Sequence, residues 1–289
     1  MEIKEITAKS LLTLSRLPDS DYAVNPYVGC EFGCAYCYAS FMGRFVKEPI
    51  DNWGNYVYAK TNAVGVFEHD LMALPRRKWN SSIFLSSVTD PYQGAEAKYK
   101  LTRGILEVLA KHQYPGEVSI QTKSVMVLRD VDVFRRLRNF DVGMTVTTTD
   151  DALSRFLEVR ASAASARIDA LRKLTEMGFR TYAFVGPLLP HFRYTPELLD
   201  ELFSAIANAG VRDVYVEHIN LKPYIKERLW KVLENAPENI RKVYESADTE
   251  PHRQALDRIV YKLLEKHGLR IRLNGVIYHK KWIDSGKVE

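Results

Sequence analysis

The stretch Asn25-Pro-Tyr-Val-Gly-Cys30-Glu-Phe-Gly-Cys34-Ala-Tyr-Cys37-Tyr-Ala39 follows the first β-rich segment of this 289-residue chain and contains all three of its cysteines. The spacing is C-x3-C-x2-C. An odd number of cysteines this close together makes a poor disulfide framework and is more typical of metal binding. Gly29 and Gly33 let the backbone wrap closely around an inorganic group, with amide N–H groups facing its sulfurs.

Three thiolates can hold three irons of a cubane cluster, which leaves the fourth iron without a protein ligand. An open metal position usually indicates chemistry rather than a structural role. A structural zinc site would want a fourth ligand, and the nearest histidine in sequence is the remote His69. Zinc or another structural metal remains an alternative, as do three free thiols, although such a group would be an oxidation hazard.

The composition is that of an ordinary globular protein, with 46% hydrophobic and 27% charged residues. The net charge of +5 permits an anionic partner without demanding one. No apolar run reaches the roughly 18 residues of a membrane span. Residues 1–10 lack the apolar region of a signal peptide. We therefore expect a soluble, cytoplasmic protein that has no membrane partner.

Short β-rich runs alternate with amphipathic helical patterns along the first 220 residues. The predicted strands are residues 22–28, 82–88, 117–122, 142–148, 181–185 and 213–218. The predicted helices are residues 98–111, 164–177 and a segment that begins after Thr195 and ends at Gly210. Six strand–helix units in series indicate an α/β fold with parallel strands and right-handed crossovers. An open doubly wound sheet and a full or partial barrel both fit, and each gathers its ligands at the C-terminal ends of the strands.

The pattern changes after Asn220. Residues 222–267 are predicted to be mostly helical, with breaks around Pro237 and before Pro251. Residues 269–278 form a possible terminal strand, and a short basic tail follows. We therefore expect two parts: residues 1–220, which carry the cysteine loop 29–38, and a C-terminal helical extension over residues 221–289.

The cysteine spacing, with the aromatic Tyr36 before the last cysteine, resembles the signature of the radical SAM superfamily. This resemblance implies a partial (β/α)6 TIM-like barrel, with Cys30, Cys34 and Cys37 as ligands of a [4Fe–4S] cluster. It further implies that the open iron chelates S-adenosylmethionine (SAM). Reductive cleavage of SAM then yields a 5′-deoxyadenosyl radical that abstracts hydrogen. Tyr36 would lie beside the adenine, and a one-electron reductant such as a flavodoxin or a ferredoxin would supply the electron.

Further motifs between residues 22 and 190 resemble a subgroup, the spore photoproduct lyase-like proteins, which are often labelled DNA repair photolyases. These motifs are residues 25–30, 36–39, 86–93, 122–124, 147–150 and 157–160. The resemblance implies that Lys123, at a strand end, pairs with the SAM carboxylate. A surface lysine is the alternative.

The same resemblance implies further cofactor contacts at strand ends. Thr147 and Thr148 would offer hydroxyls to the ribose, although strand propensity also explains them. Thr89 and Asp90 end the second strand, where Asp90 either takes the SAM ammonium or starts an Asp-Pro turn. Glu158 and Arg160, in the fourth strand–helix unit, would also contribute to the site. A surface ion pair is the alternative for these two residues.

The candidate catalytic residues depart from the lyase pattern. Ser87 aligns with the cysteine through which the lyase is thought to return hydrogen. A serine O–H bond is too strong to donate hydrogen easily to a carbon radical. Tyr36 and Tyr38 flank Cys37, so a tyrosyl relay remains conceivable, but complete thymine-dimer reversal is not expected.

Two other regions are candidates for substrate contact. Glu217 and His218 end the sixth strand, and either residue is positioned to face a substrate. Basic residues surround two aromatics near the C-terminus: Arg270, Arg272, Tyr278, His279, Lys280, Lys281 and Trp282. Such interleaving suits nucleic acid, whereas an ordinary strand with a solvated tail is the alternative.

The sequence therefore favours a radical SAM enzyme whose substrate is unidentified. A nucleic-acid repair or modification enzyme, and a non-catalytic iron–sulfur redox sensor, are the alternatives.

Overall fold

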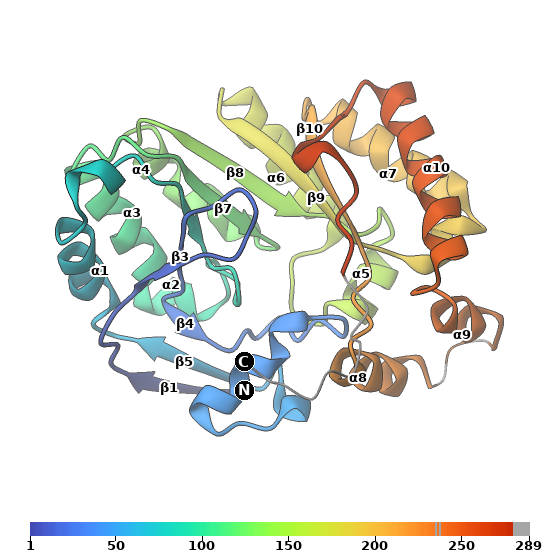
Figure 1. The fold of residues 1–289 in the computed structure, drawn as a ribbon, viewed down its shortest axis with the longest axis horizontal. Helices are drawn as coiled ribbons and strands as arrows, with labels where there is room; N and C mark the ends of the chain where they lie inside the picture. Colours follow the sequence, from blue (N-terminus) through green and yellow to red (C-terminus); the bar gives the residue numbers. More distant parts are fainter. Residues whose placement is uncertain (235, 237, 280–289) are drawn as a thin grey trace.

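The computed structural model describes residues 1–234, 236 and 238–279. Within them, one eight-stranded sheet has the order β11-β10-β9-β8-β7-β6-β3-β2 (Figure 1). Six of these strands pair in parallel in sequence order: β3 (Tyr22–Val24), β6 (Ile83–Leu85), β7 (Val118–Thr122), β8 (Phe140–Thr145), β9 (Arg180–Leu188) and β10 (Asp213–His218). The parallel strands and the intervening helices form the predicted partial barrel.

The short strand β2 (Leu12–Leu14) pairs antiparallel with β3 at one edge of this sheet. The sequence did not predict a second, three-stranded sheet of order β1-β5-β4, which lies beside the barrel. It contains β1 (Glu2–Ile6), β4 (Tyr27–Val28) and β5 (Tyr56–Lys60). The predicted strand 22–28 is divided between the two sheets, because Pro26 has no N–H to continue the first ladder.

Helices cover the outer face of the barrel in the order expected (Figure 1). They are α1 (Ala63–Met72), α2 (Ala95–Tyr99), α3 (Leu101–Lys111), α4 (Val131–Phe134), α5 (Asp151–Leu157), α6 (Ala164–Glu176) and α7 (Pro196–Asn208). The predicted helix 98–111 is interrupted at Lys100, whose backbone is left-handed. Thr195 precedes α7, but its hydroxyl bonds back to the His191 carbonyl rather than capping the helix.

The C-terminal extension is helical, as predicted, and consists of α8 (Pro223–Leu233), α9 (Glu238–Glu245) and α10 (Glu250–His267). Helix α10 packs against α7 of the barrel. The terminal strand is shorter than predicted: β11 covers only Arg270–Ile271, and Ile277 makes a single bridge to Glu217. Left-handed backbone at Leu273 and Asn274 turns the chain between them. The division of the chain at residue 220 into two domains remains a prediction.

The core lies between the parallel sheet and its helices. All six residues of β8 are buried, as expected for a strand covered on both faces. Phe140 of this strand stacks on Phe134 of α4, with 4.4 Å between the ring centroids. In the described part of the chain, no helix is both long and apolar enough to cross a lipid bilayer.

Candidate functional site

A cavity of about 450 Å³ opens at the C-terminal ends of the parallel strands, and all three cysteines line it. Eight other sequence-predicted residues also line it: Tyr36, Tyr38, Ser87, Thr89, Asp90, Lys123, Glu217 and His279. Thr147, Thr148, Glu158 and Arg160 do not. The barrel thus brings most of the predicted site residues to one place, from β6, β7, β10 and the cysteine loop.

Glycines shape the cysteine loop. Gly29 has a φ of +87°, and a Cβ there would lie only 2.5 Å from the Tyr56 carbonyl oxygen. Gly33 has a φ of +60° and faces Gly54 so closely that a Cβ on Gly54 would meet its Cα at 2.8 Å. The left-handed backbone at these two glycines bends the loop so that its backbone surrounds the three thiols. The backbone N–H of Cys37 donates to the Cys34 carbonyl at 3.1 Å.

Burial dominates the chemistry of the three thiols. It raises the pKa of Cys30 well above its ordinary value, and nearby Asp90 adds to the effect. Burial also raises the pKa of Cys34 to about 12, although the ammonium of Lys123 opposes it. For Cys37 burial again raises the pKa, against the charges of Lys123 and Arg228. Such thiols are poor free nucleophiles, and they become thiolates when a bound metal displaces their protons.

The surroundings of the loop fit an iron–sulfur group. Four buried side-chain atoms on the loop and the elements that pack on it have no hydrogen-bond partner: Ser40 Oγ, Trp53 Nε1, Tyr56 Oη and Arg228 Nη1. Of these four residues, only Trp53 also lines the cavity. Each carries a hydrogen to donate, and thiolate and sulfide sulfurs are acceptors. In the described ranges, no group of three or more His, Cys, Asp or Glu side chains is placed to hold a single metal ion. The unpartnered donors are compatible with an iron–sulfur group, and the choice between a cluster and a single zinc ion remains a prediction.

Residues that follow β6 hold the cysteine loop in place through hydrogen bonds to its backbone. The Thr89 hydroxyl donates to the Gly29 carbonyl at 2.6 Å. The Gln93 amide donates to the same carbonyl at 3.3 Å and accepts from the Glu31 N–H at 3.0 Å. Thr89 and Gln93 thus hold both ends of the segment 29–31. Sequence reasoning missed Gln93 as a contributor, although it lies inside the quoted motif 86–93.

The Asp90 carboxylate accepts three hydrogen bonds from neighbouring residues of the protein. It accepts hydrogen bonds from the Thr122 hydroxyl (2.6 Å) and the Lys123 N–H (2.8 Å). The Tyr92 N–H makes a third bond at 2.9 Å, which is the predicted Asp-Pro turn. Burial raises the pKa of Asp90 despite these bonds. Asp90 therefore joins the end of β6 to the end of β7, and its expected contact with the SAM ammonium remains a prediction.

Lys123 and Tyr36 lie together beside the cysteines. The Lys123 ammonium lies 5.8 Å from the centroid of the Tyr36 ring. Burial disfavours this charge, but the Cys34 and Glu158 groups outweigh it and raise the pKa of Lys123. The lysine is therefore a positive charge held inside the cavity rather than a surface lysine.

Glu158 lies behind Tyr36 and is fully buried. It accepts hydrogen bonds from the Tyr36 hydroxyl and from Ser154, the latter at 3.1 Å, and it pairs with Arg167. Burial opposes its charge, but Arg167 and Lys123 lower the pKa of Glu158 below the ordinary range. Arg167 is also fully buried. Sequence reasoning missed Arg167 because nothing in its helix separates it from a surface arginine.

The other residues of this unit support the loop from outside the cavity. Arg160 donates to the carbonyls of Gly54 (2.6 Å) and Glu31 (3.2 Å). Thr148 accepts a bond from the Asp150 N–H at 3.1 Å. The Thr147 hydroxyl is buried without a partner. The cofactor roles expected of Thr147, Thr148, Glu158 and Arg160 remain predictions.

Tyr38 and Ser87 meet at the mouth of the cavity, where the Tyr38 hydroxyl donates to the Ser87 carbonyl. The neighbouring Ser86 has a left-handed backbone (φ 68°), which is uncommon for a residue with a side chain, and its buried hydroxyl has no partner. Sequence reasoning missed Ser86. The catalytic roles considered for Tyr36, Tyr38 and Ser87 remain predictions.

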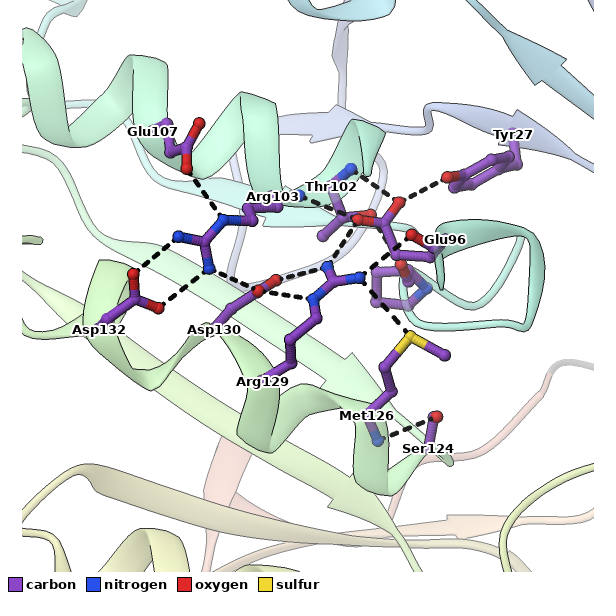
Figure 2. A network of polar contacts seen from close by, with 11 residues as sticks. Tyr27, Glu96, Thr102, Arg103, Glu107, Ser124, Met126, Arg129, Asp130 and Asp132 are labelled. Atoms are coloured by element: carbon purple, nitrogen blue, oxygen red, sulfur yellow. Dashed lines mark hydrogen bonds and ion pairs between the residues drawn. The ribbon is translucent and has the colours of Figure 1, made fainter. Parts of the chain in front are cut away.

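A buried network of charges supports the strand ends (Figure 2). Glu96 of α2 accepts from Tyr27 and from Arg129, the latter at 2.9 Å. Arg129 also pairs with the buried Asp130 at 2.8 Å, and Arg103 of α3 bonds the same carboxylate at 2.9 Å. These pairs connect the segment after β6 with the segment after β7.

The C-terminal candidates separate into two groups. Glu217 lines the cavity and pairs with His279 at 3.0 Å. His218 points away from the cavity and pairs with Asp257 of α10 at 2.8 Å, so it packs the extension on the barrel. Arg272 pairs with Asp141 at 2.8 Å. Arg270 pairs with Asp213, whereas Lys280, Lys281 and Trp282 lie outside the described residues.

Residues 24–204 match the family model of the Radical SAM superfamily. The chain belongs to the radical SAM superfamily. This radical SAM protein is 30% identical over 280 residues to the uncharacterised protein MJ0683 of Methanocaldococcus jannaschii, which covers 96% of this chain and 98% of that one. It is also 30% identical to the uncharacterised protein Rv2578c of Mycobacterium tuberculosis, over 75% of this chain and 65% of that one.

Among solved structures, the radical SAM protein resembles a mutant spore photoproduct lyase with bound AdoMet and dinucleoside spore photoproduct. The TM-score is 0.71 at 15% identity, over 93% of this chain and 81% of that chain. At this identity the likeness is one of fold. It confirms the predicted partial barrel, including the helical extension. The protein is therefore an enzyme of a superfamily that implies SAM and an iron–sulfur cluster.

Proposed function

We propose that this enzyme binds a [4Fe–4S] cluster on Cys30, Cys34 and Cys37 and reductively cleaves SAM to make a 5′-deoxyadenosyl radical. The observation that carries the proposal is one cavity lined by the three thiols, two of them buried, together with the Lys123 ammonium and the Tyr36 ring. When bound, the cluster supplies the single electron for that cleavage. A one-electron reductant such as a flavodoxin or a ferredoxin reduces it.

The protein's own residues bind and orient the cofactors. Lys123 gives the SAM carboxylate a charged partner inside the cavity. Tyr36 offers a flat face for the adenine, and its hydroxyl is fixed by Glu158, which prevents the ring from turning. Asp90 sets the position of Lys123 by holding its backbone N–H. Thr147 and Thr148 remain candidates for the ribose.

The substrate occupies the part of the cavity beyond the cysteines. A volume of about 450 Å³ lies within the roughly 300–1,000 Å³ range of small-molecule sites. Aromatic side chains of three different strands, Phe84, Phe184 and Tyr215, form its walls. Hydrogen abstraction from a small substrate, or from one residue of a larger one, fits this space.

Nucleic-acid repair or modification is the second candidate function. It is favoured by the fold likeness to a lyase that was solved with a dinucleoside photoproduct. The aromatic walls suit a base that has left its stack, because a duplex does not fit inside the cavity. Binding to DNA or RNA that weakens with salt would support this function. Absence of binding at low salt would remove it.

The cofactor proposal is tested by anaerobic reconstitution. We expect about four irons per chain, as a [4Fe–4S] cluster requires, and 5′-deoxyadenosine after reduction in the presence of SAM. Cys34→Ala should lose both. A folded wild-type protein that yields neither overturns the proposal.

Lys123→Met separates the enzyme from a redox sensor that holds a cluster without using SAM. Loss of a charged hydrogen bond is worth about 1.5–3 kcal/mol, so the Kd for SAM should rise about 10–100-fold. Lys173→Met is the matched control, because Lys173 lies on the outer helix α6 and pairs with Asp169. Equal SAM affinity in wild type and Lys123→Met would favour the sensor.

A further inference from the structure

Helix α8 lies outside the residues that match the family model, yet it packs against the cysteine loop. The Tyr224 hydroxyl donates to the Tyr38 carbonyl at 2.9 Å, and the Tyr224 ring meets Phe41 edge-on at 6.5 Å. Lys231 pairs with Asp51 at 2.7 Å. In Figure 1 this helix lies next to the N-terminal part of the chain that contains the loop. Helix α8 therefore packs on the cysteine loop from outside the cavity, whereas Leu273, Ile277 and His279 of the extension line it.

Arg228 extends from α8 toward the cysteines. Its Nη2 donates to the Cys34 carbonyl at 3.3 Å. Its Nη1 is buried without a partner. Asp51, the nearest carboxylate that influences Arg228, is already paired with Lys231. In the portion of the chain that the structure describes, this guanidinium therefore has no ion pair.

The Arg228 side chain as a whole is partly buried, but its Nη1 is fully buried. A buried donor without a partner is costly, because burial removes hydration that nothing replaces. The free Nη1–H is a donor, and the charges that act on the Arg228 guanidinium include those of Cys37 and Cys34. The sulfurs of a thiolate-bound cluster are both acceptors and carriers of negative charge. They would supply both the hydrogen-bond acceptor and the counter-charge that Arg228 lacks.

We propose that Arg228 is a positioning residue for the iron–sulfur cluster, with one arm on the Cys34 carbonyl and the other on a cluster sulfur. This inference rests on the proposed function. Reduction adds a negative charge to the cluster, and a fixed positive charge nearby stabilises the reduced form. Arg228 therefore raises the reduction potential. The C-terminal extension in this way makes the cluster easier to reduce.

The test is a redox titration of the reconstituted protein, in which the reduced cluster is followed by electron paramagnetic resonance. Arg228→Gln should lower the equilibrium constant for one-electron reduction at least tenfold, a shift of about 59 mV to more negative potential. Arg228→Lys keeps the charge but not the two-armed contact, and we expect about a threefold decrease. Lys226→Gln is the control, because it removes one charge from the same helix at a side chain that contacts the Trp230 ring. It should change the constant less than twofold.

An unchanged potential in Arg228→Gln, with full iron content, overturns the inference. If Arg228→Gln does not retain iron, Arg228→Lys decides, and a wild-type potential there overturns the inference equally. An equal shift in Lys226→Gln also overturns it, because the effect would then belong to net charge. A wild-type protein that assembles no cluster instead removes the proposed function.

Discussion

Replacing Glu158 with glutamine tests how the site is held. The change keeps the shape of the side chain and one acceptor oxygen, but removes the charge that faces Arg167. Both residues are fully buried, and the pair is supported by hydrogen bonds from Tyr36 and Ser154. Arg167 would stay charged and unpaired inside the protein.

The expected cost follows from these contacts. Removing one partner of a buried ion pair destabilises a protein by about 3–5 kcal/mol. Because the glutamine oxygen still accepts from Tyr36 or Ser154, we expect the lower end, about 3 kcal/mol. Glu158→Ala also loses those acceptors, at about 1 kcal/mol each, and should cost about 5 kcal/mol. The double variant Glu158→Gln/Arg167→Met removes the unpaired charge, and should cost less than Glu158→Gln alone.

The assay is urea unfolding followed by circular dichroism, with the SAM Kd measured on the same samples. A loss below about 1 kcal/mol in Glu158→Gln, the size of a surface pair, would refute the reasoning. A double variant that loses the sum of both single changes would also refute it. A large loss of SAM affinity with unchanged stability would instead support the direct SAM contact that the family resemblance implies for Glu158.

Three further predictions follow from the structure. Gly29→Ala should destabilise the protein by about 1–3 kcal/mol more than Gly178→Ala in urea unfolding. Both positions have left-handed backbone, but only at Gly29 would a Cβ collide with the Tyr56 carbonyl oxygen. Equal losses of stability in the two variants would contradict this. Glu96→Gln should lower the free energy of unfolding by about 3 kcal/mol, because Glu96 is fully buried where it pairs with Arg129. Asp132→Asn should lower it by less than about 1 kcal/mol, because Asp132 is exposed. The reverse order would exclude a supporting role for the network. Burial, followed by the charge of Arg193, lowers the pKa of His252 from 6.5 to about 4. The unfolded chain therefore binds more protons between those values, and stability should fall by about 2 kcal/mol as pH drops from 6.5 to 4. His252→Asn should flatten that dependence and the exposed His69→Asn should not; an identical pH profile in His252→Asn would disprove the assignment.

Local patterns predicted much of the fold. The strand 213–218 and the helix 164–177 were found to within a residue, because a buried strand and an amphipathic helix each show their period in a short window. The small sheet was missed, since β1 reads Glu-Ile-Lys-Glu-Ile and is mostly exposed. The terminal strand was overestimated because left-handed backbone at Leu273 and Asn274 leaves no periodic signal.

The sequence alone located the cysteine loop and predicted its role as a ligand site, because C-x3-C-x2-C with its glycines is a local arrangement of residues. It also placed Lys123 at the ligand face, since strand ends can be read from the period. Only the tertiary structure decided what surrounds those groups. The Glu158 carboxylate meets Tyr36 across 122 positions of the chain, and Arg228 reaches Cys34 across 194. Such contacts depend on how the barrel closes and where the extension packs, and a buried arginine looks like a surface arginine until that packing is known.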